Sequence, residues 1–224
     1  MRKPRNISFL IAESVLLALL AFSSPAAASN AETVSLDFPL DCIPNETCWI
    51  VKYVDLDPGN GRLDYRCGWL SSDGHKGVDI AIRDLGAMGD GVEVRAAAGR
   101  VQGTRDGMED VNVRTSGGVA ALKGKECGNG LVLRHSGGWE TQYCHLRKGS
   151  LRVHTGEKVK AGQHLGYAGM SGAAEFPHLH LSVRKGNKIA DPFTGRILNK
   201  DDTEQSCNMT ATPLWSGKAL AELA

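Results

Sequence analysis

Two short stretches, far apart in the chain, carry residue types that bind metal ions. The first holds His75 and Asp79 on either side of Gly77, and the second holds His178 and His180. Both stretches consist of strand-forming residues, and side chains at i, i+2 and i+4 of a strand share one face. We therefore expect His75 to face Asp79, with Gly77 leaving room between them, and the two histidines of the second stretch to face the same way.

Two imidazoles, a carboxylate and one open position make up the ligand set of a catalytic zinc. The spacing does not decide which of His178 and His180 is the ligand. It does indicate that one histidine of the pair stays free beside the metal.

Length and composition favour one β-rich domain with extensions. The chain has 224 residues, enough to bury a core, and its net charge of +1 gives no indication of a nucleic-acid partner. Many of the 27 glycines fall between short apolar runs. This pattern is typical of a turn-rich, mostly β architecture.

The first 28 residues have the features of a secretory signal peptide. Arg2, Lys3 and Arg5 form a basic start, residues 7–22 are mostly apolar, and small residues precede a cut near Ala28. A membrane anchor needs about 20 consecutive apolar residues, more than this run provides. We expect export to the periplasm or secretion, with no stable membrane insertion after cleavage and an oligomeric state that the sequence leaves open.

An even number of cysteines in an exported chain predicts disulfides. The six are Cys42, Cys48, Cys67, Cys127, Cys144 and Cys207. The apolar runs 128–135 and 139–146 are joined by Ser-Gly-Gly, which is a hairpin signal. Cys127 and Cys144 would then lie close across the ladder and form the best candidate pair, while Cys207 would tie down the tail.

The ordered motifs resemble the lysostaphin-type, LytM-domain zinc endopeptidases, which are peptidoglycan hydrolases. They are H-x-G-x-D from His75, Y-C-H-L from Tyr143 and H-L-H from His178, joined by glycine-rich spacers. The resemblance covers about residues 72 to 195. It implies an antiparallel, barrel-sandwich-like β domain at 71–195, between an N-terminal extension at 29–70 and a C-terminal tail at 196–224.

Carried over residue by residue, this resemblance assigns the zinc ligands to His75, Asp79 and His180. It leaves His145 and His178 as the unliganded catalytic histidines. The implied reaction is hydrolysis of peptide bonds in peptidoglycan, in stem-peptide cross-links, by water that one zinc ion activates. The hydroxyl of Tyr143 is expected either near the oxyanion or packed on the sheet.

Three alternatives stay open at this point. The chain could be a non-catalytic LytM-like activator of other wall hydrolases, or a protease that acts on proteins. The text V-x-A-x-x-G-x-V at 94–101 also resembles biotinyl and lipoyl carrier domains, but its corner holds no lysine to modify. The intact set of five residues favours the enzyme. A further hypothesis is that the extension at 29–70 covers the substrate groove of the peptidase domain.

Overall fold

The computed structural model describes residues 1, 33–199, 207 and 212–223. The predicted signal peptide therefore lies outside the described residues, except for Met1. The elements are β1 (Cys48–Lys52), β2 (Val78–Ile82), α1 (Leu85–Asp90), β3 (Glu93–Arg95), β4 (Gly99–Arg105), η1 (Val113–Thr115), η2 (Val119–Leu122), β5 (Asn129–Arg134), η3 (Ser136–Gly138), β6 (Trp139–Leu146), β7 (Lys158–Val159), β8 (His164–Tyr167), β9 (His178–Lys185), β10 (Lys188–Ala190) and α2 (Gly217–Leu223). None of the helices in these ranges is long and apolar enough to cross a membrane.

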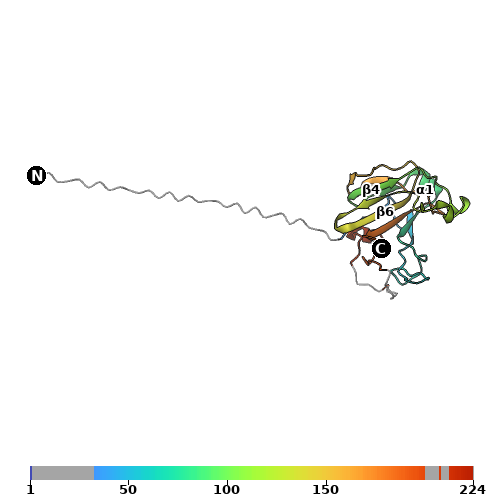
Figure 1. Ribbon diagram of the computed structural model, residues 1–224, viewed down its shortest axis with the longest axis horizontal. Helices are drawn as coiled ribbons and strands as arrows, with labels where there is room; N and C mark the ends of the chain where they lie inside the picture. Colours follow the sequence, from blue (N-terminus) through green and yellow to red (C-terminus); the bar gives the residue numbers. More distant parts are fainter. Residues whose placement is uncertain (2–32, 200–206, 208–211, 224) are drawn as a thin grey trace.

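The architecture is a large antiparallel sheet with a smaller strand pair. The large sheet runs β1-β2-β9-β6-β5-β4-β7, with β10 paired to β9, and β3 pairs with β8. In Figure 1, β4 and β6 run through the body of the fold, and α1 lies beside one end of these strands. Every strand pair between the named elements is antiparallel, which confirms the expected mostly β, antiparallel fold class.

Alternation along the central strands separates the core from the site. Val78 and Ile80 of β2 are fully buried, as are Leu179 and Val183 of β9. The residues between them point to the opposite face of the sheet because successive side chains of a strand alternate. One face of β2 and β9 therefore closes the core, and the other face is free to carry polar side chains.

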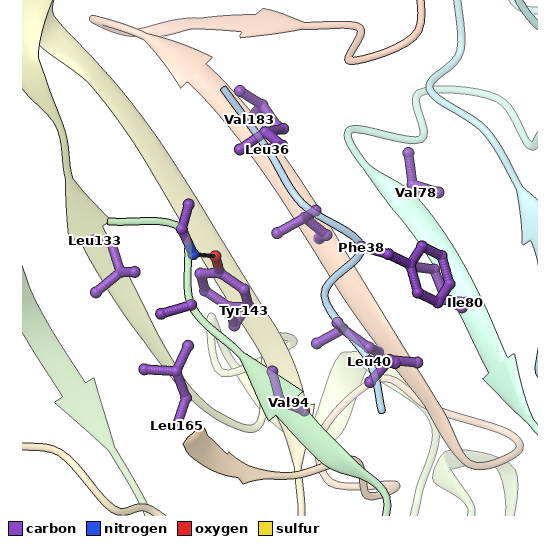
Figure 2. Close-up of a cluster of buried hydrophobic side chains, with 14 of the residues drawn as sticks. Leu36, Phe38, Leu40, Val78, Ile80, Val94, Leu133, Tyr143, Leu165 and Val183 are labelled. Atoms are coloured by element: carbon purple, nitrogen blue, oxygen red, sulfur yellow. Dashed lines mark hydrogen bonds between the residues drawn. The ribbon is translucent and has the colours of Figure 1, made fainter. Parts of the chain in front are cut away.

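A segment of the N-terminal extension completes the core. Leu36, Phe38 and Leu40 are all buried, and Figure 2 shows them along one segment that lies over the sheet beside β2 and β9. Leu40 forms a bridge with Val94 of β3, so the segment continues into the β3–β8 pair. The core thus lies between the large sheet and a second layer to which the extension belongs.

Three disulfides join the predicted cysteines. Cys127 pairs with Cys144, as predicted from the hairpin. Cys67 pairs with Cys207, which ties the tail to the extension as expected, and Cys42 pairs with Cys48 within the extension.

One expectation about local structure was wrong: His75 lies in the loop before β2 rather than in a strand. Of the two positions left open for Tyr143, the structure shows the packed one. Tyr143 is 1% exposed, and its hydroxyl accepts a hydrogen bond from the Ala97 N–H at 3.0 Å. Figure 2 shows this side chain among apolar neighbours on the core side of the sheet. The Tyr143 hydroxyl is therefore bonded to the backbone within the core and does not face the histidines.

Candidate metal centre

The sheet register places the chemically active residues of β2 and β9 next to each other. Asp79 is the cross-strand partner of His180, and Ala81 is the partner of His178. Leu179 and Leu181 occupy the core face, so the two histidines share the opposite face, as the spacing predicted.

One carboxylate oxygen of Asp79 is the point at which the imidazoles converge. His180 Nδ1 lies 2.7 Å from Asp79 Oδ1, and His75 Nε2 lies 3.1 Å from the same oxygen. One ligand atom from each of these three residues lies within 4.8 Å of the other two. The structure therefore brings His75, Asp79 and His180 into an arrangement that could hold a metal ion.

The second nitrogen of each of these imidazoles has a fixed partner. His75 Nδ1 lies 2.8 Å from the carbonyl oxygen of Tyr53, which can only accept, so this nitrogen carries a proton and the neutral ring has its lone pair on Nε2. His180 Nε2 lies 2.9 Å from the hydroxyl of Ser182, leaving Nδ1 toward Asp79. Metal-binding histidines are held in this way, with the nitrogen that does not bind the metal donating to a nearby oxygen.

Gly77 makes room for His180. A Cβ at this position would lie 2.6 Å from His180 Nε2 and 2.7 Å from the carbonyl oxygen of Leu181. The space that the sequence predicted between His75 and Asp79 is thus occupied by the His180 imidazole of β9.

His145 and His178 form a second pair beside this cluster, with ring centroids 4.6 Å apart. His145 Nδ1 donates to the Ser171 carbonyl at 2.7 Å, and His178 Nδ1 donates to the Phe176 carbonyl at 2.8 Å. The Nε2 atom of each ring therefore keeps a lone pair. His178 Nε2 lies 3.8 Å from Asp79 Oδ1, so this ring lies next to the candidate metal centre.

The backbone at His145 departs from the regular alternation of a strand. His145 has φ +63°, and the β5–β6 register shifts near the end of β6. Regular alternation would place His145 on the core face with Tyr143. The irregularity turns it toward His178 instead, as β-bulges do near active sites.

Burial and neighbouring charges keep the imidazoles of His145 and His178 neutral. Burial, followed by the charges of His178 and His180, lowers the pKa of His145 to about 3. Burial likewise lowers the pKa of His178, although the Asp79 charge opposes it. A neutral imidazole with a free lone pair can accept a proton.

For Asp79 and His75, in contrast, the surroundings favour the charged form. Burial raises the pKa of Asp79, but hydrogen bonds from His180 and His75 outweigh it and hold that pKa well below its usual range. For His75, burial lowers the pKa, and the hydrogen bond and charge of Asp79 overcome this, so the net shift is upward. Asp79 is thus an anion in a pocket of imidazoles.

His135, the other histidine that ends a predicted strand, lies apart from this cluster. Its Nδ1 donates to the Ala98 carbonyl and its Nε2 lies 2.9 Å from the Thr141 hydroxyl. Sequence reasoning missed Ser182, although its i+2 spacing from His180 places it on the same face. It also missed Lys52, whose Nζ lies 4.0 Å from Asp79 Oδ2.

The donor set fits zinc. Two imidazole nitrogens and one carboxylate oxygen, each oriented by a neighbour, match the three protein ligands of a catalytic zinc site that keeps one position open. The neutral pair beside it has the properties of a general base.

Comparison with known families places these motifs in a defined class. Residues 73–192 match the model of peptidase family M23, and the chain belongs to that family. Family membership implies a metal.

The chain is 31% identical over 115 residues to the cell division protein DipM of Caulobacter vibrioides, covering 50% of this chain and 17% of DipM. It is 37% identical over 73 residues to the peptidoglycan DD-endopeptidase ShyB of Vibrio cholerae, covering 33% of this chain and 17% of ShyB. The chain thus spans about a sixth of the length of these relatives.

Solved structures show similarity over a larger share of the chain. The catalytic domain of the M23 protein EnpA from Enterococcus faecalis aligns with 69% of this chain and 91% of its own, at 25% identity and a TM-score of 0.41. The catalytic domain of lysostaphin from Staphylococcus simulans aligns with 63% and 85%, at 22% identity and a TM-score of 0.39.

Proposed function

We propose that the protein is a zinc metalloendopeptidase that hydrolyses peptide bonds in peptidoglycan, within the cross-links between stem peptides. The observation that carries this proposal is the cluster of His75, Asp79 and His180, with each imidazole oriented by a partner on its other nitrogen. Family membership and the peptidoglycan endopeptidases among its relatives support it.

In this proposal His75, Asp79 and His180 hold one zinc ion. When bound, zinc supplies Lewis-acid polarisation of the scissile carbonyl and lowers the pKa of a water toward about 7. The buried anion of Asp79 contributes the one negative charge of the ligand set. Its low pKa keeps it ionised and ready to bind throughout the neutral range.

His145 and His178 perform the proton transfers. Each ring donates from Nδ1 to a backbone carbonyl, which fixes its orientation and leaves Nε2 to accept a proton from the attacking water. The imidazolium that forms can return the proton to the leaving amine or stabilise the oxyanion. The two rings divide these roles between them.

We further propose that the protein is exported through the signal peptide at residues 1–28 and acts in the periplasm or outside the cell. The sequence features of that segment support this proposal, as do the relatives that act on the cell wall. The substrate partner is then the peptide part of peptidoglycan.

Digestion of purified peptidoglycan tests the function. The mature chain is incubated with and without a zinc chelator, and the fragments are read by mass spectrometry. We expect cross-linked fragments to disappear, the loss to stop with chelator, and activity to return with zinc. Folded, zinc-loaded protein that releases nothing would contradict the enzyme and favour an activator of other wall hydrolases.

A further inference from the structure

A groove lies directly beside the metal centre, and one of its walls comes from the N-terminal extension. Its volume is about 920 Å³, and Trp49, Lys52, Leu85 and Phe176 are among its lining residues. Ala81, which also lines it, is the cross-strand partner of His178.

Phe176 connects the groove to the histidine pair. Its ring centroid lies 4.8 Å from that of His178, and its carbonyl is the acceptor that orients His178. A peptide bound in the groove would therefore lie next to the residues proposed to act on it.

A β-bulge in β1 determines which extension residues face this groove. Trp49 pairs with Ala81 of β2, and the register then shifts so that Lys52, rather than Val51, pairs with Asp79. Trp49 and Lys52 are three residues apart and would point to opposite faces of a regular strand. The extra residue brings both onto the face that carries the metal centre.

The groove combines an apolar surface with one positive charge close to the centre. Trp49, Leu85 and Phe176 are large hydrophobic residues with exposed side chains. The three other charged lining residues have close partners: Arg83 and Asp84 pair with each other, and Glu175 pairs with Arg114. Lys52 keeps 40% of its side chain exposed, and its charge faces Asp79 at 4.0 Å.

We propose that β1 supplies a substrate subsite, in which Lys52 pairs with a free carboxylate of the stem peptide and Trp49, with Phe176, packs on its small apolar side chains. This inference rests on the proposed function and names the part of the substrate that the groove takes. Trp49 and Lys52 lie outside the family match, which begins at residue 73. The extension is then part of the binding site rather than a cover over it.

The test compares two cross-linked stem peptides, one with its free carboxylates and one with those carboxylates amidated. Lys52→Met should raise KM for the carboxylate peptide by about 5-fold, the size of a half-exposed ion pair, and leave the amidated peptide unchanged. Trp49→Ala should raise KM for both peptides by about 10-fold, because an aromatic contact is lost. Each variant is assayed fully loaded with zinc, because Lys52 also faces Asp79, and the comparison between the two peptides isolates the carboxylate contact.

Matched controls lie elsewhere on the molecule. Trp69→Ala removes a tryptophan that is 75% exposed, and Lys158→Met removes an exposed lysine of β7. Neither control should change KM. An equal effect of Lys52→Met on both peptides, or none on either, would overturn the carboxylate pairing, and an unchanged KM in Trp49→Ala would overturn the apolar contact.

Binding of the same peptides, measured by calorimetry, separates this inference from the proposed function. Wild-type protein that binds both peptides without cleaving them would contradict the proposed function, while the Kd values of the variants would still decide the subsite. Failure to bind either peptide would overturn the subsite itself.

Discussion

At Asp79, one buried carboxylate oxygen lies 2.7 Å from His180 Nδ1, 3.1 Å from His75 Nε2 and 3.8 Å from His178 Nε2. A buried anion is costly unless a positive charge or several donors compensate it. Three imidazoles compensate it only when they carry protons on these nitrogens. The backbone carbonyls that bind the opposite nitrogens of His75 and His178 disfavour those tautomers. A divalent cation held by His75, Asp79 and His180 would resolve this conflict, because it would neutralise the carboxylate while the imidazoles stay neutral.

The close approach at Gly77 gives the first prediction. Gly77→Ala places a Cβ 2.6 Å from His180 Nε2 and close to backbone, so the ring has to leave its position. We expect this variant to lose most of its zinc affinity in a chelator competition assay. Gly103→Ala in β4 is the control, because no heavy atom lies within 4 Å of its added Cβ. Equal zinc affinity in both variants would contradict the packing that we describe.

The hydrogen bond from His180 to Ser182 gives the second prediction. Ser182→Ala removes the partner of His180 Nε2 at 2.9 Å and frees the ring to rotate. We expect zinc affinity to fall by about 10- to 100-fold, as is common when the oxygen partner of a metal-binding histidine is removed. Zinc titration against a fluorescent chelator measures this change. An unchanged Kd for zinc would mean that Ser182 does not orient the ring.

At the scale of the elements, the end of β6 positions His145. The Cys127–Cys144 disulfide joins the residue before His145 to the turn that precedes β5, and the Cys127 carbonyl accepts the His145 N–H at 2.8 Å. His145 also has φ +63°, a conformation that non-glycine residues adopt at a cost. The disulfide and this hydrogen bond together hold the strained strand end in place.

Removing that disulfide should separate catalysis from metal binding. In Cys127→Ser/Cys144→Ser, we expect kcat to fall by about 10²-fold, because a small displacement of a catalytic group has effects of this size. Zinc should remain at one per chain, since no ligand changes. Cys42→Ser/Cys48→Ser, which opens a disulfide within the extension, is the control. Loss of kcat to the same degree in both variants would point to a general loss of stability instead.

At the scale of the whole molecule, the turn after β10 joins the sheet to the extension and the tail. The Phe193 ring stacks on Tyr65 at 4.5 Å and contacts Trp215 at 5.6 Å. Asp191 starts this turn and is fully buried. Its Oδ1 accepts hydrogen bonds from Phe193 and Thr194, while its Oδ2 has no hydrogen-bond partner among the described residues.

This buried carboxyl makes stability depend on pH. Burial raises the pKa of Asp191 to about 6, although the hydrogen bonds from Thr194 and Phe193 oppose the shift. The folded state thus binds the Asp191 proton more tightly than the unfolded state, whose pKa is about 3.9. Ionising Asp191 therefore destabilises the fold at pH 7, and this penalty fades as pH falls through 6 toward 4.

Asp191→Asn removes the charge and keeps the Oδ1 acceptor. We expect the Tm of the variant to exceed that of the wild type at pH 7.5, and the difference to shrink as pH falls to 5. Thermal melts at several pH values measure it. Asp73→Asn, which changes an exposed carboxylate, is the control for net charge. A difference between Asp191→Asn and the wild type that does not change with pH would contradict the raised pKa.

Local sequence patterns predicted the β5–β6 hairpin, its disulfide and the shared face of His178 and His180, because these depend on alternation and short turns. They left the position of Tyr143 open, since the irregular strand end at His145 is a property of the folded sheet. The β-bulge that turns Lys52 toward Asp79 could likewise not be predicted from the sequence, because its position depends on how β1 aligns with β2. The packing of residues 34–40 over the sheet depends on contacts far apart in the chain, and composition does not specify them.

The most direct measurement is the zinc content and turnover of three purified proteins: the wild type, Asp79→Ala and His145→Ala. We expect one zinc per chain in the wild type, and neither zinc nor activity in Asp79→Ala, which lacks the charged ligand. His145→Ala should keep its zinc and lose about 10²- to 10⁴-fold in kcat, the contribution of a general acid or base. Loss of zinc from His145→Ala, or full zinc in Asp79→Ala, would contradict the division into ligands and catalytic histidines.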